Sequence, residues 1–240
     1  MLEELSERLA KAHEGLFEHF QVDCCSGVVR GPYLKFTSYP YVGSRYGTGK
    51  KLMVVGLDIG DNEGGDRIQS YECRRRRVEP QCPTSYGPHM AGTYVTAMYV
   101  LVRELNEECD EWKRWLDEAC RDGKDSTPQE LLRTKRLPDR NPVSHIAFTN
   151  YYKFLVANTG EKLQLERGRE ECFLVEEAQS LEPDAILLQS AAFRSGYEKL
   201  LSNLSTFAMV FVGNHPAVRG EARRLENFLK SIEPFPWKRT

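Results

Sequence analysis

The sequence predicts an α/β fold built on a parallel sheet. Three observations support this: four apolar runs have the length of buried strands, segments with helical spacing separate them, and each run ends in a polar, turn-rich loop. Strands that alternate with helices are typical of a parallel sheet covered on both faces. The expected strands are 51–57, 143–150, 185–188 and 207–213. A chain of 240 residues with 40% hydrophobic content fits a single domain over 1–240.

The N-terminal part is predicted to be a helix followed by an aromatic wrap, together spanning 1–50. Residues 2–20 carry apolar side chains at helical spacing. The aromatic segment 31–49 contains several Gly and Pro residues, so we expect irregular structure at the sheet edge or the mouth of a site. The chain start lacks the features of a signal peptide, and no apolar run approaches the roughly 20 residues of a membrane helix. We therefore expect a cytoplasmic protein without membrane contact.

The later helices follow from the same periodicity. It predicts helices over 94–107, 111–119, 170–181, 192–201 and 221–232. Thr127-Pro128-Gln129-Glu130 has the pattern of a capping box with proline at the first helical position, and it predicts a short helix through Leu132. Residues 61–92 form a long polar insert loop rich in Arg. Loops of this length are usually functional or disordered.

The cysteines and the charges exclude some classes of protein. Seven cysteines stand at irregular spacing and none forms a Cys-x-x-Cys pair, so we expect free thiols, no metal and no cofactor. The net charge is −2, which excludes a globally basic protein but not local phosphate contacts. Two basic runs stand out, Arg74-Arg75-Arg76-Arg77 and Arg133-Thr134-Lys135-Arg136. Each fits either a solvated face or a contact with nucleic-acid phosphates.

Polar residues follow each expected strand: Asp58 with Asp61, Asn150, Gln189 with Ser190, and Asn214 with His215. Ligands of open α/β sheets bind in the crevice outside these strand ends. An amide fits the hydrogen-bonding edge of a heterocyclic base, an imidazole can stabilise charge on a leaving group, and a carboxylate can orient water. Each residue taken alone is more often a turn or cap residue. Their joint occurrence favours chemistry in one crevice.

Four segments at these strand ends form an ordered set. They are Gly56-Leu57-Asp58-Ile59-Gly60-Asp61, Phe148-Thr149-Asn150-Tyr151-Tyr152-Lys153, Asp184-Ala185-Ile186-Leu187-Leu188-Gln189-Ser190 and Asn214-His215-Pro216-Ala217-Val218-Arg219. In this order they resemble the motifs of the uracil-DNA glycosylase superfamily, over about 51–229. The likeness is closest to its iron–sulfur branch. The resemblance implies a three-layer α/β/α sandwich around a four-stranded parallel sheet, and excision of a base flipped out of DNA.

The resemblance also implies roles for single residues. Asp58 matches the water-activating carboxylate, with Asp61 as the second candidate acid. Asn150 matches the amide that reads the base. His215 matches the histidine that faces the base carbonyl oxygen and stabilises the departing anion.

Two more segments gain roles in the same way. Val218 and Arg219 match the loop that pushes into the duplex. Pro88-His89-Met90-Ala91-Gly92 resembles the segment that normally carries a base-stacking Phe, and here His89 or Met90 takes its place.

The sequence departs from the family pattern at several positions. Ile59 stands where a Pro usually follows the first acid, next to the base. The insert loop is longer than usual and carries the run Arg74–Arg77, which we expect to contact DNA phosphates. Phe154 replaces a cluster cysteine, and Cys24 and Cys25 are adjacent, so we expect no iron–sulfur cluster. The changes around the base favour a substituted pyrimidine slightly over uracil.

The leading interpretation is a monomeric, monofunctional DNA glycosylase, with DNA as its partner. Uracil, another deaminated base and a modified pyrimidine of phage DNA remain open as substrates, as do genome repair and defence against foreign DNA. One alternative is a non-catalytic nucleic-acid-binding module on the same fold, which Ile59 and the missing Phe favour. Another is a small-molecule hydrolase of nucleotides or nucleosides. The lack of a Gly-x-Gly-x-x-Gly motif and of a P-loop weighs against a dinucleotide or ATP site.

Overall fold

The computed structural model describes residues 2–22, 33–36, 39–57, 75–76, 78–79, 81–156 and 171–236, with the backbone alone for 2, 33–36 and 154–156. Its centre is a six-stranded sheet in the order β2-β4-β3-β6-β7-β8. The parallel strands are β3 (Leu52–Gly56), β4 (Ile146–Asn150), β6 (Ala185–Gln189) and β7 (Met209–Gly213). Short antiparallel strands border them, β2 (Tyr41–Val42) and β8 (Glu233–Phe235). The α/β class and the four parallel strands are confirmed, but the sheet is mixed and six-stranded rather than four-stranded.

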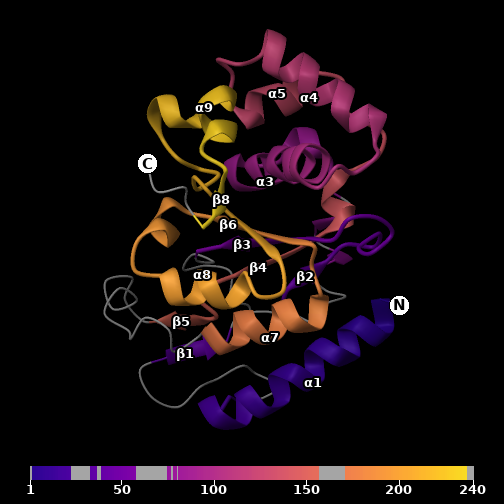
Figure 1. Cartoon of the computed structure of the whole chain (residues 1–240). Helices are drawn as coiled ribbons and strands as arrows, with labels where there is room; N and C mark the ends of the chain where they lie inside the picture. Colours follow the sequence, from indigo (N-terminus) through magenta and orange to yellow (C-terminus); the bar gives the residue numbers. More distant parts are fainter. Residues whose placement is uncertain are drawn as a thin grey trace.

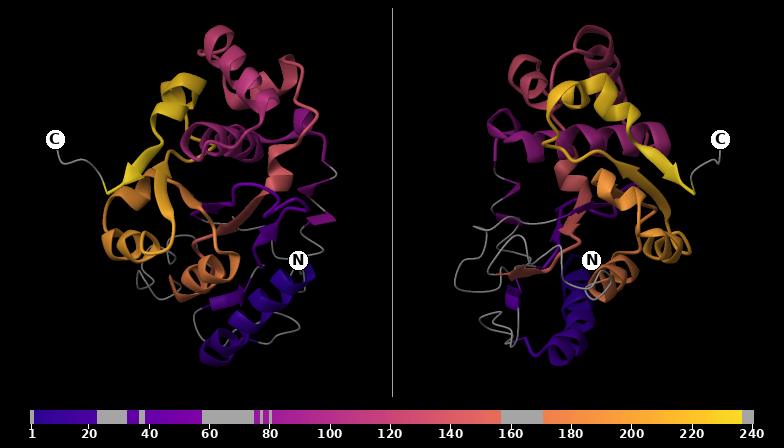
Figure 2. Two further views of the ribbon diagram at one scale, coloured as in Figure 1. Left: turned by 45° about the vertical axis from the view of Figure 1, so that its right-hand side comes forward. Right: turned by 90° about the vertical axis from the view of Figure 1, so that its left-hand side faces the viewer.

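Helices cover both faces of this sheet (Figures 1 and 2). One face carries α3 (Pro88–Tyr99), α4 (Asp110–Asp122), α5 (Pro128–Thr134) and α9 (Leu225–Lys230). The other carries α7 (Glu171–Leu181) and α8 (Glu198–Leu204), and α1 (Leu2–Phe20) packs along the outside of α7. A separate two-stranded antiparallel sheet pairs β1 (Tyr33–Phe36) with β5 (Phe154–Val156).

Side chains of the parallel strands alternate between two apolar cores. Leu52 and Val54 pack on the α3 face, whereas Met53 and Val55 pack on the α7 face. Successive residues of a strand point to opposite faces, which produces this alternation. All five residues of β6 are buried, as expected for a strand at the centre of a sheet covered on both sides. The same alternation decides which polar residues at the strand ends share a face.

The helix expected over 94–107 has different bounds. It begins at Pro88, so 88–92 belongs to α3 and not to the insert loop, and beyond Tyr99 it continues as a π-helical turn, η2 (Val100–Glu104). Proline suits the first helical position because the N–H it lacks would have no helical partner there. Residues 111–119 lie in the separate helix α4.

Several other expected elements are shorter or divided. The strand expected over 143–150 starts with the 3-10 turn η3 (Pro142–His145). The helix expected over 192–201 is divided into η4 (Ala191–Arg194) and α8, and Gly196 between them has a φ of 80°, which an α-helix does not accommodate. The last expected helix is divided into η5 (Gly220–Arg223) and α9.

Other expectations hold more closely. Helices occupy Leu2–Phe20 and Glu171–Leu181. In the capping box of α5, the Glu130 N–H donates to Thr127 Oγ1 over 3.3 Å and the Thr127 N–H donates to Glu130 Oε2 over 2.7 Å. A 3-10 turn, η1 (Pro83–Ser85), precedes α3. Segment 31–49 is less irregular than expected, because it contains β1 and β2. None of the described helices combines the length and the apolar character needed to cross a membrane.

Candidate active site

Four strand ends form one row at the carboxyl edge of the sheet. Gly56 is in register with Asn150, Gln189 is in register with Gly213, and β3 and β6 lie side by side between these pairs. Each of the four residues stands two positions after a residue that packs on the α3 face, so all four face α3. The row therefore presents two amide side chains, each beside a glycine.

Asn150 lies directly over the backbone of Gly56. A Cβ atom placed on Gly56 would stand 2.5 Å from Asn150 Oδ1, closer than two such atoms can approach. Glycine at this strand end thus leaves room for the amide. Within the described part of the chain the Asn150 side chain makes no hydrogen bond.

Gln189 has a different role, because its amide is fully used inside the protein. Its Oε1 accepts from Thr93 Oγ1 over 3.0 Å, and its Nε2 donates to Thr96 Oγ1 over 2.7 Å. The side chain is 3% exposed. Both threonines lie on α3, so this strand end fixes the helix against the sheet and is not free to bind a ligand.

The first turns of α3 meet the loop that follows β7. A Cβ on Gly92 would stand 2.6 Å from Pro216 Cβ, so glycine permits the close approach of helix and loop. One turn earlier, the rings of His89 and His215 pack edge to face, with centroids 4.7 Å apart. The helix terminus and the His-Pro-Ala loop thus form one side of the site.

The hydrogen bonding of His215 indicates its tautomer. Nδ1 accepts from the backbone N–H of Ala217 over 3.3 Å, so the ring proton of the neutral form lies on Nε2. Partial burial lowers the pKa of His215 below its ordinary value, and the neighbouring His89 lowers it further. His215 is therefore a neutral ring that offers an N–H donor.

The base of the histidine loop is held by the C-terminal segment. The N–H of Asn214 donates to Ser231 Oγ over 2.9 Å, and Arg194 Nη2 donates to the carbonyl oxygen of Ser231 over 2.5 Å. Arg194 also forms an ion pair with Glu233 at the start of β8, with 3.5 Å between Nε and Oε2. The loop thus starts from a fixed position at the end of β7.

Asn150 and His215 share one end and one face of the sheet, but they do not touch. Their strands are separated by β3 and β6, and three strand spacings amount to about 14 Å. This spacing suits two groups that bind a ligand from opposite edges.

The expected acids Asp58 and Asp61, and Ile59 beside them, lie outside the described residues, as do Arg74 and Arg77. The structure describes the chain up to Leu57, the residue before Asp58. The N–H of Tyr151 donates to the carbonyl oxygen of Gly56 over 2.8 Å, and that of Tyr152 donates to Leu57 over 3.0 Å. These bonds prolong the pairing of β3 and β4 by two residues, up to the position before the acid.

The structure separates the two candidates for the stacking position. His89 is exposed and lies against His215, whereas Met90 is partly buried against the core on the α3 face. His89 is therefore the residue beside the site, and Met90 belongs to the core.

The expected DNA contacts that the structure describes lie in two separate places, one after the histidine loop and one beside the residues that precede β4. Val218 donates its N–H to the carbonyl oxygen of His215 over 2.9 Å, and Arg219 is exposed just beyond this turn. Arg75 and Arg76 lie in a short helical turn near the opposite edge of the sheet, where Glu79 of the same segment accepts a hydrogen bond from Tyr41 of β2 over 3.2 Å.

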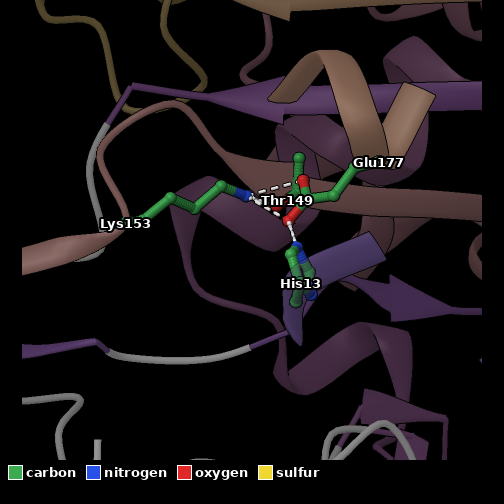
Figure 3. A network of polar contacts seen from close by, with 4 residues as sticks. All are labelled: His13, Thr149, Lys153 and Glu177. Atoms are coloured by element: carbon green, nitrogen blue, oxygen red, sulfur yellow. Dashed lines mark hydrogen bonds and ion pairs between the residues drawn. The ribbon is translucent and has the colours of Figure 1, made fainter. Parts of the chain in front are cut away.

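A buried polar cluster lies behind Asn150, on the α7 face (Figure 3). The Lys153 ammonium donates to Thr149 Oγ1 and, over 2.6 Å each, to both carboxylate oxygens of Glu177. His13 of α1 contacts the same carboxylate, with 3.2 Å between Nε2 and Oε1. Lys153 is 1% exposed, and Glu177 and His13 are fully buried. We call these four residues the rear network.

The described residues contain no cluster of three or more His, Cys, Asp or Glu side chains that could hold a metal ion. The cysteines among them carry free thiols: Cys82, Cys109, Cys120 and Cys172. The site as described is built from amide and imidazole groups.

Comparison of the chain with protein-family models, with curated protein sequences and with solved structures found no match in any of the three. The site thus has to be interpreted from its own geometry. Sequence reasoning found Asn150 and His215, but it missed the role of Gly56, the binding of α3 by Gln189 and the rear network. The glycine that ends β3, like the one that ends β7, was a usable signal for Gly56, whereas the other two depend on contacts between distant segments.

Proposed function

We propose that this protein is a monofunctional DNA glycosylase, which hydrolyses the N-glycosidic bond of a flipped-out base. One observation carries the proposal: the open Asn150 amide over Gly56 and the neutral His215 ring share one end and one face of the sheet. An amide matches the donor and acceptor edge of a base extruded from the stack. A neutral imidazole N–H suits a carbonyl oxygen that gains negative charge as the bond breaks.

In the proposed reaction, Asn150 binds the edge of the base and His215 Nε2–H donates to its carbonyl oxygen. The bond between the sugar C1′ and the base nitrogen breaks, the electron pair stays on the base, and the sugar becomes oxocarbenium-like. Asp58 favours that positive charge and accepts a proton from the water whose oxygen bonds to C1′. The products are the free base and an abasic site.

Water as the nucleophile is supported by the state of Lys153. A glycosylase that also cuts the strand uses an amine to attack the sugar carbon, and such an amine has to be unprotonated and accessible. Lys153 is the lysine nearest to Asn150 along the chain, but its ammonium has three acceptors and lies on the other face of the sheet.

The loop after His215 is suited to contact the duplex. Val218 is a partly exposed apolar side chain at its tip, and apolar side chains of this kind unstack base steps. Within the described part of the chain, the exposed Arg219 makes no ion pair, which leaves its charge for a phosphate. We extend the proposal to the arginine run 74–77 as a second phosphate contact.

The substrate we favour is a substituted pyrimidine. His89 borders the site at the position where the family pattern has a Phe ring, and its ring nitrogens can hydrogen-bond to a polar substituent. Plain uracil carries no such group. Action on modified phage DNA would follow from this preference, and genome repair would follow from a preference for uracil.

The experiment that tests the function uses matched duplex oligonucleotides carrying uracil, hypoxanthine, xanthine, hydroxymethylcytosine or glucosylated hydroxymethylcytosine. Alkali treatment reveals abasic sites, and single-turnover rates rank the bases. We expect abasic sites on at least one duplex, with faster release of a substituted pyrimidine than of uracil. Faster uracil release would contradict the substrate preference alone.

The same panel separates the alternatives. DNA binding without abasic sites on any duplex would support a non-catalytic binding module. Hydrolysis of free nucleosides or nucleotides without action on DNA would support a small-molecule hydrolase. Either result would overturn the proposed glycosylase.

A further inference from the structure

The rear network is more elaborate than the support of a single helix requires. The Lys153 ammonium, in the turn after β4, binds both the Thr149 hydroxyl and the Glu177 carboxylate of α7. His13 of α1 contacts the same carboxylate. Thr149 is the residue directly before Asn150. Neighbouring residues of a strand point to opposite faces of the sheet. The network therefore binds β4 on the α7 face, and the Asn150 amide lies on the α3 face of the same strand.

Its electrostatics show that Lys153 and His13 are both coupled to Glu177. Burial alone would raise the pKa of the Glu177 carboxyl, but the Lys153 ammonium and the His13 ring hold it below its ordinary value. The ammonium in turn uses all three of its N–H donors. The attraction between two buried charges offsets their desolvation only when hydrogen bonds also satisfy them, and removing one partner leaves an unpaired buried charge.

The network also reaches the chain that leads to Asp58. The turn from Asn150 to Lys153 contains Tyr151 and Tyr152, whose N–H groups bind the carbonyl oxygens of Gly56 and Leu57. The contact between Lys153 and Glu177 therefore fixes a turn that joins the ends of β3 and β4.

The N-terminal helix is part of this arrangement. His13 lies on α1 and its ring packs among Phe17, Tyr39 and Phe173, at centroid distances of 5.8, 5.1 and 5.5 Å. The aromatic packing fixes the ring, and the ring contacts Glu177. A helix at the far side of α7 is thereby joined to the strand end that carries Asn150.

We infer that Thr149, Lys153, Glu177 and His13 are positioning residues, which hold the Asn150 amide and the chain before Asp58 in the geometry for base excision. The inference rests on the proposed function, because it assigns the network to the same site. It gives the three-element network a task that fold stability alone does not require, since an apolar cluster of similar volume stabilises a core at least as well as a buried ion pair.

The cleanest test replaces Thr149. Thr149→Val keeps the shape of the side chain and the Lys153–Glu177 pair but removes the acceptor, and Thr149→Ser keeps the hydroxyl. We expect Thr149→Val to lower the single-turnover excision rate about tenfold with unchanged DNA affinity, because small misplacements of a binding group cost rate. Thr149→Ser should retain the rate.

A second variant removes the ion pair without leaving a buried charge. Lys153→Met with Glu177→Met substitutes apolar side chains of similar length for both partners, and the variant should fold, with the thermal midpoint lowered only by the contact that the buried His13 ring loses. A folded double variant that excises at the wild-type rate would overturn the inference, as would a Thr149→Val variant at that rate.

A readout without turnover keeps the inference separate from the proposed function. The side-chain NH₂ resonance of Asn150 in ¹⁵N NMR spectra should shift or broaden in Thr149→Val and in the double variant, and stay in place in Thr149→Ser. The Asn141 side chain serves as the internal control. An unmoved Asn150 resonance in both variants would contradict the positioning role, whatever the enzyme does to DNA.

Discussion

Thr149 and Asn150 are neighbours in the chain, yet they belong to two opposite kinds of environment. On the α7 face, the hydroxyl of Thr149 accepts a hydrogen bond from Lys153, whose ammonium also binds the Glu177 carboxylate. His13 contacts the same carboxylate. On the α3 face, the Asn150 amide lies over Gly56 with no hydrogen bond from the described residues. A single peptide unit thus separates the hydrogen-bonded rear network from the Asn150 amide.

The difference shows how binding groups can be distinguished from structural ones. Polar groups that are buried for stability need partners, because an unpaired one costs free energy. A polar group that binds a ligand cannot also be hydrogen-bonded within the protein. Its position then has to be fixed by contacts of the neighbouring residues. Here Gly56 leaves space for the Asn150 amide on the α3 face. The rear network supports the same strand from the α7 face.

The largest effect on the excision rate is expected from substitutions in the candidate active site. His215→Ala and Asp58→Asn should each lower the single-turnover rate by roughly 10²- to 10³-fold, because both act on charge that develops in the transition state. DNA affinity should change little. The control is His19→Ala, which removes an exposed histidine of α1 and should leave the rate unchanged. Wild-type rates from both site variants would reject the assigned roles, and loss only in Asp61→Asn would transfer the acid role to Asp61.

An intermediate effect is expected from Gly56→Ala. The added Cβ would meet the end of the Asn150 side chain, which can rotate away, so the amide should move while the strand stays folded. We expect a loss of about tenfold or more in the single-turnover rate. The matched control is Gly15→Ala on α1, where nothing lies within 4 Å of the new Cβ.

The control should raise the free energy of unfolding by about 0.5–1 kcal/mol without touching the rate, since alanine is the better helix former. Equal rates in wild type and Gly56→Ala would show that the amide does not have to lie over Gly56.

The smallest effect concerns pH. Protonation of His215 on Nδ1 would remove the acceptor for the Ala217 N–H, so the neutral ring is the competent form. Since the pKa of His215 is lowered, the decline of excision on acidification should have its midpoint below pH 6.5, the ordinary histidine value. His89→Phe keeps a ring in place but removes a cause of the lowering, so the decline should begin at higher pH, with a change of less than about tenfold at any pH. A rate that rises on acidification would contradict a neutral donor.

The parts of the fold that sequence predicts well are those decided within one segment. Apolar runs that serve as buried parallel strands, the α1 periodicity and the Thr127 capping box carry their signal locally. The edge strands β2 and β8 were missed because they have two and three residues, too few for a pattern. The start of α3 was missed because Pro88 was assigned to the preceding loop. In the structure this proline is the first residue of the helix.

The candidate site shows the same limit. Asn150 and His215 were predicted because each follows an apolar run, and strand ends gather at one edge of a parallel sheet. The close approach of Gly56 to Asn150 depends on the register of strands almost a hundred residues apart in the sequence. The rear network depends on three such segments at once, and no local pattern in the sequence contains that information.

The edge strands have a consequence for how molecules of this protein meet one another. A sheet edge with free N–H and C=O groups can pair with the edge of a second molecule and begin aggregation. One edge of this sheet is the two-residue β2, and the other is the three-residue β8, whose central residue is Pro234. Proline has no N–H to donate to a further strand, and short edges offer few positions for pairing. Concentrated solutions should therefore resist the strand-by-strand growth to which an open parallel sheet is exposed.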